Sequence, residues 1–182
     1  MHPFSRRALL ALPLVVAFAA SADEAVTNTI VIKTKKGDIV IRLRPDLAPK
    51  HVTQIQKLVK RKFYDGVVFH RVIPGFMAQT GDPTGTGMGG SKLPNIPAEF
   101  SSEPFKRGTL GMARANDPNS ANSQFFICFG DASFLNNNYT VIGQVVSGME
   151  AIDKLKAGTE ANNGQVDHPD KIISLRFAPD AK

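Results

Sequence analysis

Two short runs of β-branched and aliphatic residues, 29–33 (TIVIK) and 39–43 (IVIRL), lie on either side of a predicted turn centred on Gly37. Runs of this length that are bounded by turn residues are typical of paired strands. They predict an antiparallel hairpin near the start of the domain. This hairpin constrains the rest of the fold, because its apolar face must be covered by further strands or helices.

Further strands are predicted at residues 67–73, 76–79, 109–113, 124–129, 140–146 and 171–177. The loop between the strands at 76–79 and 109–113, residues 81–104, is rich in Gly, Pro and Ser. Strands and helices do not alternate, which disfavours a doubly wound parallel sheet. The pattern instead predicts an antiparallel sheet rolled into a barrel, in which the last strand pairs with the first.

Two helices accompany these strands. The first is predicted to begin at Asp46 as its N-cap, with Pro49 in its first turn, and to end near Phe63. Its apolar residues recur at helical spacing. The second is predicted over residues 149–156, with Gly158 beyond its end.

Residues 1–22 have the three-part pattern of a secretory signal peptide: the basic pair Arg6-Arg7, a short apolar run, and an A-x-A sequence that ends at Ala22. We therefore expect residues 23–182 to form the mature domain and to reach the periplasm. A membrane anchor is the alternative, and it is disfavoured because the apolar run is short for a bilayer. The arginine pair leaves two export routes open, the general one and the twin-arginine one.

The charge of the mature domain gives little support to nucleic-acid binding. Residues 1–22 contain two of the 22 Lys and Arg and none of the 16 Asp and Glu, so their removal lowers the formal net charge from +6 to +4. The densest basic cluster, residues 57–62 (KLVKRK), lies where the first helix is predicted to end, and cations there suit the helix dipole. The single cysteine, Cys128, lies in an apolar run and is expected to be a buried, inert thiol.

Several motifs that could indicate other enzymes are weak. Residues 85–90 match G-x-G-x-x-G, but residues 93–97 (LPNIP) cannot begin a regular helix, so a dinucleotide site is disfavoured. The histidines at positions 51, 70 and 168 are far apart and have no paired cysteine, and there is no G-x-S-x-G sequence. We expect neither a metal nor a cofactor, and neither hydrolysis nor phosphoryl transfer.

Arg71 is the most unusual residue, because it lies among apolar residues of a predicted strand. A guanidinium there is costly unless it has a partner or borders a groove. It could be a structural arginine paired with an acid. A second segment favours the groove: by strand alternation Gln124 and Phe126 face one way and Phe125 and Ile127 the other. An amide beside an aromatic ring suits peptide binding.

The segments F-H-R-V-I-P-G-F-M-x-Q-x-G-D, from Phe69, and S-Q-F-F-I, from Ser123, closely resemble the cyclophilin family. The resemblance extends to residues 108–113 (GTLGMA) and 141–143 (VIG), and it covers residues 29–177. It implies a mainly β fold, an eight-stranded antiparallel closed β-barrel capped by two α-helices. It also implies peptidyl-prolyl cis/trans isomerase activity, which breaks no bond and needs no cofactor.

Position by position, the resemblance implies catalytic roles for Arg71, Gln79 and Phe76. It implies substrate-binding roles for Met77, Gly85, Ala113, Arg114, Ala115, Gln124, Phe126, Phe134, Leu135 and Tyr139. The expected partners are proline-containing peptides and unfolded or partly folded exported proteins, and the expected state is a monomer. A domain that only binds peptides is the rival reading, and the presence of Arg71 favours the enzyme.

Three residues depart from the pattern of many relatives, which carry asparagine, tryptophan and histidine in place of Arg114, Phe134 and Tyr139. In all three the chain resembles the bacterial exported branch of the family. The departures leave Arg71 and the pocket floor intact, so catalysis is expected. They predict a changed substrate preference and only weak binding of cyclosporin.

Overall fold

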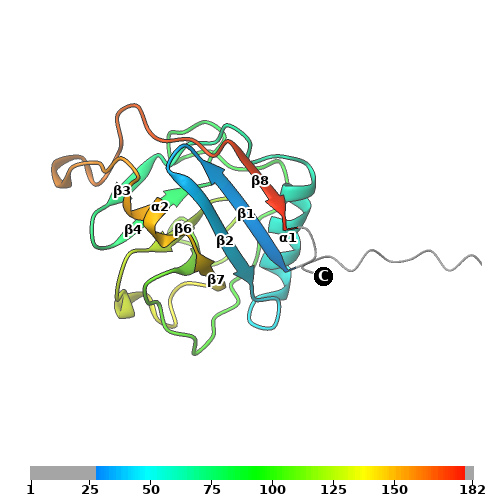
Figure 1. Cartoon of the computed structure of the whole chain (residues 1–182). Helices are drawn as coiled ribbons and strands as arrows, with labels where there is room; N and C mark the ends of the chain where they lie inside the picture. Colours follow the sequence, from blue (N-terminus) through cyan, green and yellow to red (C-terminus); the bar gives the residue numbers. More distant parts are fainter. Residues whose placement is uncertain (1–27, 179–182) are drawn as a thin grey trace, which may run out of the picture.

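The computed structural model describes residues 28–178, and the predicted signal peptide lies outside this range. The described residues form one antiparallel sheet (Figure 1). Its strand order is β3-β4-β6-β5-β7-β2-β1-β8. The strands are β1 (Thr29–Thr34), β2 (Gly37–Leu43), β3 (Arg71–Ile73), β4 (Met77–Thr80), β5 (Thr109–Met112), β6 (Phe125–Cys128), β7 (Val141–Ser147) and β8 (Ser174–Phe177). The predicted mainly β fold with two α-helices is confirmed.

The hairpin predicted from the first two apolar runs is present as β1 and β2. Its register pairs Thr34 with Gly37, whose positive φ of 137° suits a residue without a side chain. Alternate residues of both strands, among them Ile32 and Ile41, are buried. One face of the hairpin therefore contributes to the core, as the period of two requires.

The sheet is curled, but its two outer strands are not joined by a continuous ladder of backbone hydrogen bonds. β1 pairs with both β2 and β8, as predicted. The outer strands β3 and β8 do not pair with each other in the described sheet. Isolated bridges, Val68 to Lys171 and Arg71 to Gln165, instead connect the chain around β3 to the segment before β8. The expected closed barrel is thus a half-barrel, because the chain before each outer strand is irregular where continuous strands were predicted over residues 67–73 and 171–177.

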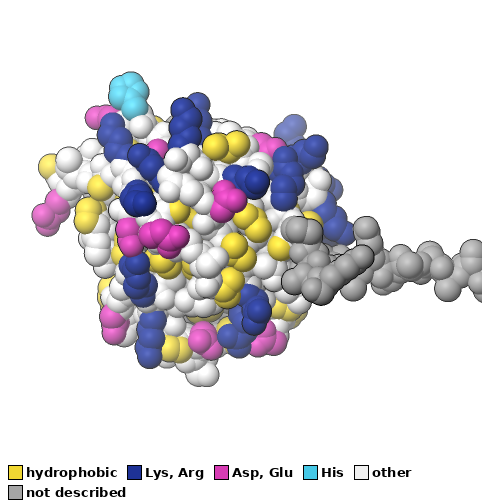
Figure 2. All heavy atoms as spheres, in the orientation of Figure 1, with side chains coloured by type: hydrophobic (Ala, Val, Ile, Leu, Met, Phe, Trp, Pro, Cys, Tyr) yellow, Lys and Arg dark blue, Asp and Glu magenta, His cyan; other side chains and the backbone are white. Residues whose placement is uncertain are grey.

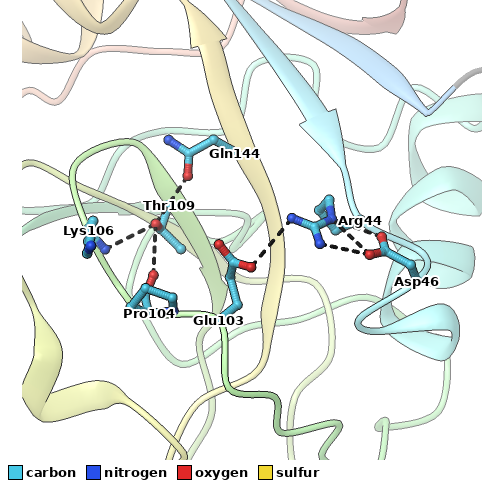
Figure 3. A network of polar contacts seen from close by, with 7 residues as sticks. All are labelled: Arg44, Asp46, Glu103, Pro104, Lys106, Thr109 and Gln144. Carbon is cyan, nitrogen blue, oxygen red and sulfur yellow. Dashed lines mark hydrogen bonds and ion pairs between the residues drawn. The ribbon is translucent and has the colours of Figure 1, made fainter.

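The first helix, α1 (Pro49–Lys60), has Pro49 in its first turn as predicted, but Asp46 does not cap it. Asp46 instead accepts two hydrogen bonds from the guanidinium of Arg44, at 2.9 and 2.8 Å from Nε and Nη2 (Figure 3). A planar guanidinium fits a carboxylate through both oxygens, and this pairing takes the side chain away from the helix. The prediction of an Asp46 cap was therefore wrong.

Glu99, on the loop of residues 81–104, instead accepts hydrogen bonds from the backbone N–H groups at the start of α1. Its carboxylate accepts the backbone N–H groups of Lys50 and His51 at 3.2 and 3.1 Å, and it lies 2.6 Å from Nδ1 of the buried His51. A carboxylate at a helix N-terminus is favoured by the helix dipole. The loop of residues 81–104 is therefore fastened to the helix by contacts that are distant in sequence.

A second polar network fastens the end of this loop to the sheet (Figure 3). Arg44 lies 3.6 Å from the carboxylate of Glu103, and Thr109 Oγ1 accepts the backbone N–H of Lys106 at 3.1 Å. Thr109 Oγ1 also lies 3.2 Å from Gln144 Oε1 on β7. These contacts connect the chain before β5 to β2 and β7, and so fix where β5 enters the sheet.

The second helix, α2 (Met149–Asp153), ends earlier than predicted. Two 3₁₀ helices, η1 (Ser133–Leu135) and η2 (Glu160–Asn162), were not predicted. Helix α1 packs against β8, and α2 packs against β2 (Figure 1). Both helices thus cover the main core, whereas η1 and η2 belong to segments that border the candidate site.

The buried apolar side chains form two clusters. The larger lies between the sheet and the two α-helices, and includes Phe125 and Ile127. The smaller consists of Met77, Phe105, Phe126, Cys128, Ala132, Leu135 and Val141. Successive residues of β6 therefore contribute to different clusters, which confirms the predicted opposition of their side chains. On the surface shown in Figure 2, Lys and Arg are interspersed with Asp and Glu.

Candidate functional site

Three adjacent strands place the central residues of the site side by side. In the register of β3 and β4, Arg71 pairs with Gln79 and Ile73 with Met77. In the register of β4 and β6, Gln79 pairs with Phe126. Since paired residues in an antiparallel sheet point to the same face, the predicted groove residues of all three strands share one side.

Hydrogen bonds link these side chains in a row. Arg71 Nη1 donates to Gln79 Oε1 at 3.3 Å, and Gln79 Nε2 donates to Gln124 Oε1 at 2.9 Å. Gln124 Nε2 then donates to the backbone oxygens of Gly87 and Gly89, at 3.0 and 2.8 Å. Because a guanidinium only donates, Gln79 must turn its oxygen toward Arg71, and this fixes the orientation of both amides.

The opposite side of Arg71 is held by Asn163. Arg71 Nε donates to the backbone oxygen of Asn163, and Nη2 donates to its side-chain oxygen, both at 2.9 Å. Within residues 28–178, these partners and Gln79 are uncharged, so the alternative of an arginine paired with an acid is wrong. Partial burial lowers the pKa of Arg71, but a guanidinium remains protonated at physiological pH.

A groove of about 750 Å³ opens beside this cation, and we call it the Arg71 groove. Four of the predicted residues give it an apolar floor and wall: Phe76, Met77, Phe126 and Leu135. They belong to, or pack against, the smaller buried cluster. The groove therefore combines a fixed cation with a rigid apolar surface, which suits a small apolar ring next to a polar group.

Aromatic rings form the rim of the Arg71 groove. The ring centroids of Phe76 and Phe134 lie 5.1 Å apart, and Phe134 is 67% exposed. On the other side Tyr139 meets Phe126 edge to face, with centroids 5.9 Å apart. The exposed ring of Phe134 can thus contact a bound molecule without any change in the core.

Arg114 stands beside this rim. Its guanidinium carbon lies 4.5 Å from the centre of the Tyr139 ring, within the range of a cation–π contact. Its Nη2 donates to the backbone oxygen of Asn138 at 2.9 Å, and its Nη1 to that of Ala115 at 2.9 Å. Arg114 is therefore held against the segment of Asn138 and Tyr139, which also lines the groove.

A second groove of about 580 Å³, the Gly89 groove, continues from the first. The two share Gln79, Gly87, Ala113 and Arg114. Of the predicted residues, Ala115 and Gln124 line only the Gly89 groove. An extended chain that lies along the Arg71 groove can therefore continue into the second groove past Arg114.

The loop that carries Gly87 and Gly89 is shaped by Asp82, which is fully buried. The carboxylate accepts the backbone N–H groups of Thr84, Gly87 and Gly89, at 2.8, 2.7 and 3.0 Å. Burial raises the pKa of Asp82, but these hydrogen bonds outweigh burial and lower it to about 2. The charged carboxylate thereby presents the two carbonyl groups that Gln124 contacts.

The structure brings together the predicted site residues with one exception. Gly85, with a φ of 71°, lies outside the lining of both grooves, whereas its neighbours Thr86 and Gly87 line the Arg71 groove. Its positive φ marks it as a turn residue that shapes this loop. At this point the residues that follow Gly85 line the groove in its place.

Several groove residues were missed by the sequence reasoning: His70, Thr86, Gly87, Asn138, Asn162, Asn163 and Gln165. Asn163 is the most important of them, because it contacts Arg71 twice. Its signal in the sequence was the Asn163-Gly164 pair, since asparagine before glycine favours a left-handed turn. Asn163 indeed has a φ of 56°.

Other kinds of site find little support in the part of the chain that the structure describes. No group of three metal-ligating side chains occurs in residues 28–178. Across the same range, no helix is long and apolar enough to cross a membrane. Cys128 is a free, buried thiol as predicted, and burial raises its pKa to about 12.

Comparison with known proteins agrees with this geometry. Residues 29–177 match the family model described as cyclophilin type peptidyl-prolyl cis-trans isomerase/CLD. The chain is 58% identical over 175 residues to the probable peptidyl-prolyl cis-trans isomerase of Brucella suis, covering 90% of this chain and 88% of the relative. It is 40% identical to the peptidyl-prolyl cis-trans isomerase-like 1 of Gibberella zeae, covering 74% and 86%.

Solved structures show the same architecture. The cyclophilin AquaCyp293 of Hirschia baltica matches with a TM-score of 0.75 and 28% identity, over 85% of this chain and 75% of that one. A cyclophilin type peptidyl-prolyl cis-trans isomerase of Cryptosporidium parvum, solved in the presence of the dipeptide Ala-Pro, matches with a TM-score of 0.75 and 29% identity, over 84% and 99%. The chain therefore belongs to the cyclophilin-type peptidyl-prolyl cis-trans isomerases.

Proposed function

We propose that the Arg71 groove binds the X-Pro segment of unfolded or partly folded proteins outside the cytoplasm, and that Arg71 is the central catalytic residue. The apolar surface of Phe76, Met77, Phe126 and Leu135 receives the proline ring. The observation that carries this assignment is a fixed cation beside a ring-sized apolar surface. The Cryptosporidium relative, solved in the presence of Ala-Pro, supports a proline-containing ligand.

The chemistry required is stabilisation of a twisted amide. Amide resonance gives the cis/trans barrier of about 18–20 kcal/mol. In the twisted state the proline nitrogen becomes pyramidal and regains a lone pair, which can accept a hydrogen bond that the planar amide cannot. A donor fixed at this nitrogen therefore stabilises the transition state more than the ground state.

The hydrogen bonds of Arg71 orient its guanidinium to act as that donor. Its Nε donates to the backbone of Asn163, its Nη2 to the Asn163 side chain, and its Nη1 to Gln79. A guanidinium has five N–H groups, so one on each terminal nitrogen is left for a substrate. Because the engaged donors hold the plane of the guanidinium, little reorganisation is needed when the amide twists.

Gln79, Gln124 and the edge formed by Ala113, Arg114 and Ala115 hold the backbone on either side of the proline. Fixing the flanking chain confines rotation to one bond. A rate gain near 10⁵ requires about 7 kcal/mol of differential stabilisation. A partly desolvated arginine together with this orientation supplies stabilisation of that order.

The proposed setting is the periplasm, where the chain acts as a monomer on exported proteins. The signal-peptide pattern of residues 1–22 supports the location. X-Pro isomerisation is slow enough to limit folding, so newly exported chains are suitable substrates. One chain supplies both grooves, which supports action as a monomer.

The test is an isomerisation assay with residues 23–182 and a short Ala-Pro peptide, followed by refolding of a protein whose slow phase is proline-limited. We expect acceleration of both, and its loss in Arg71→Ala. A domain that only binds peptides would give saturable binding without acceleration, and this outcome would reject the catalytic assignment. Cell fractionation with detection of the protein in the periplasmic fraction tests the location.

A further inference from the structure

The charges of the two grooves are unbalanced. Among the described residues that line them, Arg71 and Arg114 are the charged ones at neutral pH, and there is no Asp or Glu. His70 also lines the Arg71 groove, and burial lowers its pKa, which keeps the ring neutral. The continuous groove therefore presents two positive charges without a carboxylate on its surface.

Within residues 28–178, no carboxylate forms an ion pair with Arg114. Its guanidinium donates to the backbone oxygens of Ala115, Asn116 and Asn138 at 2.9, 3.2 and 2.9 Å, all uncharged partners. Its Nε is buried and has no hydrogen-bond partner in the described part of the chain. Arg114 is therefore fixed in position by uncharged partners, and one N–H of its Nη2 is left for a bound molecule.

The neighbouring carboxylates are engaged elsewhere. Asp117, three residues further along, accepts the backbone N–H of Asn119 at 2.8 Å and does not line either groove. Asp82 is buried beneath the loop and accepts three backbone N–H groups, including that of Gly89. Neither side chain shields Arg114 from a molecule in the groove.

Arg114 also lies at the junction of the two grooves. It lines both grooves, together with Gln79, Gly87 and Ala113. An extended peptide advances about 3.3 Å per residue. With the proline on the floor formed by Phe126 and its neighbours, side chains one or two residues from the proline therefore lie at the boundary that Arg114 occupies.

We propose that Arg114 is a specificity-determining residue that selects proline segments with a carboxylate one or two residues from the proline. This inference rests on the proposed function and names its preferred substrate class, acidic X-Pro segments. An ion pair at a partly exposed site gives a preference of about two- to fivefold for glutamate over glutamine. A lysine at the same position is disfavoured, because it meets two cations.

The experiment uses residues 23–182 and short proline peptides that differ only in Glu, Gln or Lys at positions one and two on either side of the proline. The kcat/KM of isomerisation is measured by NMR exchange, and affinity by NMR titration of the same peptides. We expect a Glu-to-Gln ratio of about two to five at one or more of these positions. The ratio should approach one at high salt, because salt screens exposed charges.

Three variants identify the source of the ratio. Arg114→Gln should bring the ratio to one, whereas Arg114→Lys should restore a preference for glutamate, because it keeps the charge. Arg42→Gln is the matched control: it removes the same charge from an exposed position on β2 outside both grooves, and it should leave the ratio unchanged. Circular dichroism checks that each variant is folded.

A ratio of one in the unaltered protein, or a ratio that persists in Arg114→Gln, would overturn the inference. Absence of turnover on every peptide, including the Gln series, would instead reject the proposed catalysis. In that case the NMR titration still compares the affinities for Glu and Gln peptides. The preference for a carboxylate is therefore tested separately from the isomerase activity.

Discussion

The guanidinium of Arg71 is held by both oxygens of Asn163, one from the backbone and one from the side chain, at 2.9 Å each. The two residues belong to parts of the chain that are far apart in sequence, β3 and the turn after η2. Asn163 has a φ of 56°, a left-handed conformation that asparagine tolerates better than most residues. The orientation of the proposed catalytic cation thus depends on a turn near the end of the domain.

Asn163→Gly should lower kcat about tenfold with little change in KM, because misplacing a catalytic group by even 1 Å can cost up to about 10². Glycine keeps the backbone oxygen and accepts the left-handed conformation without cost, so stability should not fall. Asn137→Gly is the matched control, since Asn137 has a φ of 60°, is exposed, and lines neither groove. Steady-state kinetics and thermal unfolding of both variants decide the matter, and an unchanged kcat in Asn163→Gly would show that the side chain does not position Arg71.

Arg71→Ala should lower kcat/KM about 10²-fold or more, the scale for loss of a key electrostatic donor. The thermal midpoint should change little, because Arg71 lines a groove and is only partly buried. Arg71→Lys keeps the charge but loses the planar fork that contacts both Gln79 and Asn163. Its kcat/KM should therefore lie between those of the unaltered protein and Arg71→Ala. A folded Arg71→Ala protein with normal turnover would disprove the assignment.

Asp82 should make the protein sensitive to acid. Its folded pKa of about 2 is lower than the unfolded value of about 3.9, so its stabilisation is complete above the unfolded value and disappears as the pH falls through about 2. The shift corresponds to about 2 kcal/mol. Asp82→Asn should therefore be less stable than the unaltered protein at pH 7, and the difference should shrink between pH 4 and pH 2.

Urea unfolding as a function of pH measures this difference. Asp117→Asn is the control, because Asp117 is exposed and accepts one backbone N–H in place of three. A stability difference between the unaltered protein and Asp82→Asn that does not vary with pH would contradict the stated role of the charged carboxylate.

Phe134→Trp should tighten inhibition by cyclosporin about tenfold to hundredfold. Phe134 is exposed at the rim of the Arg71 groove, and its ring offers no hydrogen-bond donor. An indole N–H there can satisfy a ligand carbonyl, at about 1–3 kcal/mol. Inhibition assays on the two proteins in parallel provide the measurement, and equal inhibition constants would direct attention to Tyr139 instead.

The mature protein is expected to begin at Asp23, after the A-x-A sequence that ends at Ala22. N-terminal sequencing of protein from the periplasmic fraction gives the answer, and an intact leader in that fraction would contradict it. Replacing Arg6-Arg7 with two lysines separates the export routes, because loss of export would indicate the twin-arginine pathway.

The strands could be predicted because each is a local pattern, whereas the apolar floor of the groove was implied by the family resemblance. Alternation alone placed Gln124 and Phe126 on one face, and the register of β4 and β6 agrees. The apolar run around Cys128 likewise predicted its burial. Such features depend on neighbouring residues along one strand, which the sequence displays directly.

Features that depend on distant partners were not predictable. Asp46 was expected to cap α1, but Arg44 binds it and Glu99 takes its place. Nothing in the local sequence indicates that a glutamate from another loop reaches the helix. The contact of Asn163 with Arg71 is of the same kind, because only the folded sheet brings its turn to β3.

We expect the pairing of β1 with β8 to limit when a newly made chain can become active. The first strand lacks one of its two partners until the last strand has been synthesised. The turn that carries Asn163 also arrives late, long after Arg71. An incomplete chain therefore contains the proposed catalytic arginine but lacks Asn163, which orients it. Activity should begin only when β8 has been synthesised and can pair with β1. Polypeptides truncated before Ser174 should accordingly be inactive, even though they contain every residue of both grooves.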